Sequence, residues 1–179
     1  MMTGGYPKQV IVDFLSNPQE SGVRVDVVTI HFIKERIIPG HQLYAIMFED
    51  DAGQQYYGNC LLRQDTAGNW RIGGASWGAG IPVRSQPWAN LGGGDGSNFY
   101  AGGYVSDNGF NVARVRLIGD NGVVLEDTVE NGQVLFLTDQ HVETPVKIEL
   151  YDDAGKSVGS HIALPEASFF RFQRTGRTV

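Results

Sequence analysis

The sequence predicts a mainly β protein, in which one helix and an antiparallel meander are followed by a β-sandwich. Short runs of alternating apolar and polar residues recur along the chain, as expected for strands with one buried face. Turn signals such as Asn-Gly and Asp-Asp-Ala-Gly separate these runs, and 24 glycines stand against seven prolines. Helical spacing of apolar residues is confined to one early segment. With 179 residues, the chain can form one ordinary domain or two small ones.

The first unit is predicted over residues 1–78. A helix is expected from Pro7 to Asn17, because its apolar residues share one face and Asn17-Pro18 is a stop signal. An antiparallel meander of four strands follows, over residues 23–33, 41–49, 54–63 and 70–76. The first strand is apolar on both faces from Val27 onward. We therefore expect both of its faces to be covered, one of them by the helix.

Residues 79–104 are predicted to be a glycine-rich loop that connects two β units. Neither strand nor helix periodicity persists through most of this stretch, and long loops are usually functional or linkers. Aromatic side chains there suggest a contact surface for a sugar, peptide or protein. The alternative is that they cover the junction between the two β units. The candidate binding residues are Trp77, Trp88, Asp95, Phe99, Tyr100 and Tyr104.

Residues 105–165 are predicted to form the sandwich. Aligning the apolar faces of residues 112–118 and 123–130 places Leu117 opposite Leu125 and Arg116 opposite Glu126. This register requires a three-residue loop with Gly122 in the left-handed conformation. Asn131-Gly132 then signals a two-residue hairpin.

The stretch from Val112 to Val158 resembles the immunoglobulin-like or transthyretin-like sandwich modules attached to many bacterial proteins. The resemblance is carried by Val115 to Leu117, Asp120-Asn121-Gly122, Leu125, Asn131-Gly132 and Glu149 to Gly155. It covers about a quarter of the chain, and it implies a β-sandwich without implying any catalytic residue.

Composition and charge exclude several functional classes. The net charge of −6 argues against binding to nucleic acid or to anionic lipid. Cys60 is the only cysteine, so neither an internal disulfide nor a cysteine-based zinc site is expected. The first residues lack the features of a signal peptide, and no apolar run reaches the roughly 20 residues of a membrane span. A cytoplasmic location is therefore the expectation.

Catalytic and cofactor motifs are weak. Gly74-Ala75-Ser76-Trp77-Gly78 has the letters of a nucleophile elbow, but it lacks the strand-to-helix context. His31 and His41 flank one predicted hairpin, where they could meet in a metal or acid/base site. The run from Gly92 to Asn98 lacks the following helix of a phosphate loop, and we expect a flexible connector there. No metal and no cofactor are expected.

The basic, aromatic tail over residues 166–179 differs from the acidic remainder of the chain. We expect its phenylalanines to be buried, either on their own domain or on a second copy of the chain. The sequence favours a non-enzymatic binding or self-assembling structural protein, whose partner is a second copy or another protein. A small-ligand carrier and a hydrolase using Ser76 are the alternatives. The candidate interaction residues of the tail are Phe169, Phe170, Arg171, Phe172, Arg174 and Arg177.

Overall fold

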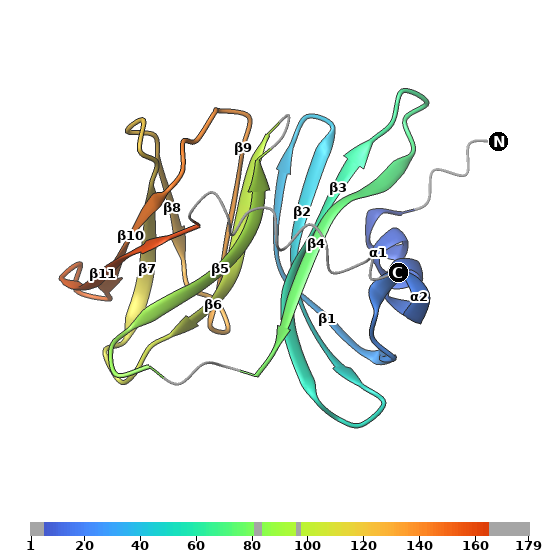
Figure 1. Ribbon diagram of the computed structural model, residues 1–179, viewed down its shortest axis with the longest axis horizontal. Helices are drawn as coiled ribbons and strands as arrows, with labels where there is room; N and C mark the ends of the chain where they lie inside the picture. The colour runs from blue at the N-terminus through green and yellow to red at the C-terminus, as the bar shows by residue number, and fades with distance from the viewer. Residues whose placement is uncertain (1–5, 81–83, 96–97, 165–179) are drawn as a thin grey trace.

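The computed structural model describes residues 6–80, 84–95 and 98–164, and these residues form a mainly β fold. The described residues form three antiparallel sheets with strand orders β1-β2-β3-β4 (sheet A), β5-β6-β9 (sheet B) and β11-β10-β7-β8 (sheet C). Figure 1 shows the layers in sequence, with the helices outside sheet A, sheet B in the middle and sheet C beyond it. The elements are α1 (Pro7–Ser16), α2 (Pro18–Ser21), β1 (Val25–Ile38), β2 (His41–Asp50), β3 (Gln55–Gln64), β4 (Trp70–Ala79), β5 (Trp88–Asp95), β6 (Phe99–Ser106), β7 (Val112–Ile118), β8 (Val124–Thr128), β9 (Gln133–Thr138), β10 (Val146–Asp152) and β11 (Ser157–Ala163).

The first unit follows the predicted helix and meander. Ile11 and Leu15 of α1 are fully buried against the outer face of sheet A, within a cluster that also holds Cys60. The sequence did not predict α2, a single turn after Pro18. The prediction that both faces of the first strand are covered was wrong at the start of β1. Val27 and Val28 are exposed there, where the register with β2 shifts. Irregular edges of this kind discourage pairing with other sheets.

The prediction of a loop over residues 79–104 was wrong for most of its length, because β5 and much of β6 lie there. These strands pair along their whole length, from Trp88 opposite Ser106 to Asp95 opposite Phe99. Glycine is needed because the backbones come so close. A Cβ atom at Gly93 would lie 2.1 Å from the carbonyl oxygen of Tyr100, well inside van der Waals contact. Glycine has no side chain, so the strand leaves no apolar alternation in the sequence.

The sandwich follows the predicted register. Leu117 pairs with Leu125 and Arg116 with Glu126, and Gly122 is left-handed with a φ of 83°. The Asn131-Gly132 hairpin, flanked by Glu130 opposite Gln133, carries the chain from sheet C to sheet B. The core of the sandwich lies between these sheets, and its buried residues come from β5, β6, β7, β9 and β10, together with Val142 and Leu164.

A buried ion pair joins the first unit to the sandwich. The Nζ atom of Lys34 in β1 lies 2.9 Å from a carboxylate oxygen of Asp127 in β8, and both side chains are almost fully buried. The same oxygen, Oδ2, accepts the backbone N–H of Leu135 at 2.7 Å, and Arg36 donates to the other oxygen, Oδ1. These contacts cross between sheets A, B and C, so the layers are held together by polar contacts as well as apolar ones. No helix within the described residues is long and apolar enough to cross a membrane.

Candidate functional site

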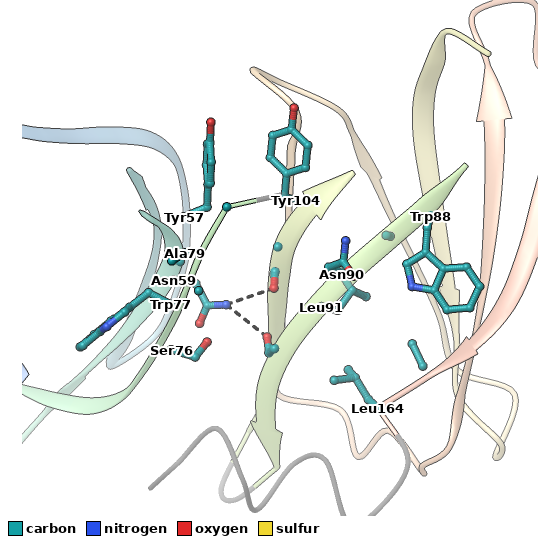
Figure 2. Close-up of a pocket in the computed structure, with 18 of the residues that line it drawn as sticks. Tyr57, Asn59, Ser76, Trp77, Ala79, Trp88, Asn90, Leu91, Tyr104 and Leu164 are labelled. Atoms are coloured by element: carbon teal, nitrogen blue, oxygen red, sulfur yellow. Dashed lines mark hydrogen bonds between the residues drawn. The ribbon is translucent and has the colours of Figure 1, made fainter. Parts of the chain in front are cut away.

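A cleft of about 360 Å³ opens between sheets A and B. One wall comes from β3 and β4, the other comes from β5 and β6, and the end of β11 closes one side (Figure 2). Its lining is mostly apolar and includes Asn59, Ser76, Gly78, Asn90, Gly102 and Leu164.

The cleft exists because the facing side chains become small along the interface between the two sheets. Next to it, the interface is filled by Leu43, Leu61, Tyr100 and Leu135, all of which are buried. Within the cleft, Ser76 and Gly78 of β4 face the Gly92–Gly102 pair of sheet B. At Gly78 an added Cβ atom would meet nothing within 4 Å, so the space beside it is open.

Asn59 lies at the floor of the cleft and bridges the two sheets. Its Nδ2 donates to the carbonyl oxygens of Gly92 at 3.1 Å and Gly102 at 3.2 Å, as the dashed lines in Figure 2 show. The side chain is 1% exposed, and its Oδ1 has no hydrogen-bond partner among the described residues. Nor does Nδ2 of Asn90, which is buried on the opposite wall. These two atoms are buried and unpaired beside the cleft, and leaving such groups unpaired is costly.

Both walls of the cleft end in edge strands. Within the described part of the chain, β4 pairs only with β3, and β5 pairs only with β6. The outer backbone N–H and C=O groups of an edge strand are a template for pairing with another extended chain. The cleft therefore combines two sheet edges with an apolar lining.

The predicted aromatic residues do not form one surface. Phe99 lies in the sandwich core, and Tyr100 lies between sheets A and B, where burial raises its pKa to about 12. The Trp77 ring points away from the cleft (Figure 2) and packs 6.0 Å from Phe14 beneath α1. Phe99, Tyr100 and Trp77 therefore cover the junctions between layers and do not form an exposed contact surface.

Tyr104 and Trp88 do line the cleft. The rings of Tyr104 and Tyr57 lie 4.9 Å apart at one end of it. Trp88 stacks on His161 with 3.7 Å between ring centroids, and the Arg84 guanidinium lies 4.4 Å from the Trp88 ring. Burial lowers the pKa of His161, whose Nε2 lies 3.1 Å from the carbonyl oxygen of Ala89. Asp95 ends β5, but its side chain is outside the described residues, as is the whole tail over residues 166–179.

The chemistry of the lining differs from that of a catalytic site. Ser76 lies within β4, so its motif is part of a continuous strand and not of a strand-to-helix turn. The described residues that line the cleft include no histidine and no carboxylate to activate this serine. His31 and His41 do not meet, since His31 pairs with Met47 and His41 with Ile38. Burial raises the pKa of the Cys60 thiol to about 12, so it is a poor nucleophile.

Sequence reasoning missed the polar groups of the cleft. Asn59 stands alone in an apolar run, and Asn90 stands in a stretch interpreted as a loop. A single asparagine inside a predicted strand was the available signal, because a buried amide needs partners. No protein-family model matches the chain, and no curated protein matches it either.

Proposed function

We propose that this protein is a non-enzymatic binding or self-assembling protein, and that the cleft between β4 and β5 receives an extended polypeptide. The observation that carries this proposal is the position of two edge strands, one on each wall of an apolar cleft. An extended peptide can add to such an edge through backbone hydrogen bonds, while the lining contacts its side chains.

We infer that β5 to β11 form an immunoglobulin-like sandwich, and the strand order supports this inference. Lettered A to G in chain order, the strands divide into A-B-E and G-F-C-D. Constant-type immunoglobulin domains divide into A-B-E-D and C-F-G. The difference is that the fourth strand, β8, pairs with β7 and not with β9. Many cell-surface domains share this architecture, although the fold alone does not decide the function.

A small-ligand carrier is the second candidate, and the polar floor of the cleft favours it. The volume of about 360 Å³ is within the range of small-molecule sites, which combine apolar walls with a few polar groups. A small molecule would raise the thermal stability of a carrier without changing the number of chains in the particle. The polypeptide-binding proposal differs because it predicts association.

The proposal is tested by measuring mass by light scattering over a concentration series up to high micromolar. We expect the mass of the wild-type protein to rise with concentration. The Gly78→Val variant should remain monomeric, because the new side chain extends into the cleft, where its Cβ atom meets nothing within 4 Å. Ser160→Val is the matched control, since it adds a valine at an exposed position of β11 outside the cleft. A wild-type protein that is monomeric throughout would contradict self-assembly, and a Gly78→Val variant that associates equally would contradict the role of the cleft.

A further inference from the structure

We propose that the polypeptide bound in the cleft is the segment over residues 165–179 of a second copy of this chain. This inference rests on the proposed function and names its partner. The observation behind it is that Leu164, the last described residue, lines the cleft. The segment therefore begins at the edge of the site that it would fill in another molecule.

The segment is long enough to cover the whole cleft. Its fifteen residues span about 50 Å when extended. Strand β4 has ten residues, which corresponds to about 33 Å. The segment can therefore run along the exposed edge of β4 and still leave several residues to connect the two molecules.

Composition and charge also fit this occupant. Phe169, Phe170 and Phe172 are apolar, as is most of the cleft lining, and exposed phenylalanines favour association. Three arginines and Glu166 give the segment a net charge of 3 − 1 = +2, so the remainder of the chain carries −6 − 2 = −8. A basic segment is attracted to such an acidic molecule, most strongly at low salt.

The backbone at Leu164 explains why a second copy supplies the segment. Leu164 has a φ of 46°, although it is not glycine, and it precedes Pro165. The left-handed conformation is unfavourable for leucine, and a residue before proline is restricted to extended conformations. An extended Leu164 would remove this strain and would change the direction in which the chain continues. Short, strained connections of this kind favour exchange of a segment between copies.

Disulfide trapping in the full-length chain tests the inference. One population carries Gly78→Cys, and the other carries Ser168→Cys, Gln173→Cys or Thr178→Cys, so that three positions along the segment are sampled. After mixing and oxidation, we expect at least one pairing to give about tenfold more disulfide-linked dimer than its control, because binding raises the effective concentration of the thiols. Native Cys60 does not compete, because it is fully buried. The control replaces Gly78→Cys by Ser160→Cys, which is exposed on β11 outside the cleft.

Two outcomes would overturn the inference. If none of the three pairings exceeds its control, the segment does not occupy the cleft. If the two cysteines in one chain form a disulfide in dilute, monomeric protein, the segment fills its own cleft and not that of a second copy. Neither outcome depends on the light-scattering experiment with Gly78→Val. A failure of this inference is therefore distinguishable from a failure of the proposed function.

Discussion

Sheet B is flanked by two interfaces of different character. Its interface with sheet C is filled by apolar side chains, including Phe99, Leu117 and Ile148. Its interface with sheet A is filled only in part, by the Leu43–Leu61–Tyr100–Leu135 cluster, and opens into the cleft beyond it. The strands are paired in both halves of that interface, with one register shift between β3 and β4 at Leu61 and Leu62. The comparison shows that the identity of the inward-facing residues decides where two sheets leave a cleft between them.

The largest expected effect distinguishes the filled half of the A–B interface from its open half. We expect Leu61→Ala to lower the free energy of unfolding by about 3 kcal/mol, because it leaves a cavity at a fully buried position. Ser76→Ala, on the neighbouring strand of the same sheet, should change it by less than about 0.5 kcal/mol. Ser76→Ala should also leave self-association unchanged, because alanine keeps the small side chain that leaves the cleft open. Urea denaturation and light scattering measure the two effects, and equal destabilisation by both substitutions would contradict the distinction.

The sandwich register was predictable because each face of its strands is chemically distinct. Leu117 and Leu125 had to share a buried face, and Gly122 had to turn the chain between them. The cleft was not predictable in this way. Glycines in β5 and β6 add no apolar side chain to the sequence pattern. They allow the backbones of the two strands to approach closely, and this contact is visible only in the folded structure. The Lys34–Asp127 pair likewise joins residues that are 93 positions apart in the sequence.

The second prediction compares two glycines that both line the cleft. A Cβ atom at Gly102 would lie 2.8 Å from Cδ1 of Leu135 and 3.3 Å from Nδ2 of Asn59, whereas Gly78 faces open space. We expect Gly102→Ala to destabilise the protein by about 2 kcal/mol through overpacking. Gly78→Ala should be neutral or stabilising by about 0.5 kcal/mol, because it restricts the unfolded chain. Thermal unfolding of both variants checks this difference. A tolerated alanine at Gly102 would show that the floor of the cleft can move.

The smallest effect concerns pH at the end of the cleft. Burial lowers the pKa of His161 below its ordinary value of about 6.5, so the folded protein binds this proton less readily than the unfolded chain. The contribution of neutral His161 is therefore complete above that ordinary value, and it is lost as the pH falls towards the folded-state pKa. We expect His161→Phe, which retains an aromatic ring beside Trp88, to lose less stability than wild type between about pH 7.5 and about pH 5.5. Urea unfolding at both pH values tests this, and an identical loss in the two proteins would contradict it.

Hydrogen exchange tests the central claim, that the edges of β4 and β5 bind a polypeptide, most directly. The outer amides of these strands have no partner strand among the described residues, whereas those of the filled interface lie within paired sheets. Raising the concentration of the full-length protein should slow exchange over residues 70–79 and 88–95, because assembly pairs their free edges. The residues of the sandwich core should exchange at unchanged rates. If the mass rises while the new protection falls on β1, or on neither edge of the cleft, the account is contradicted.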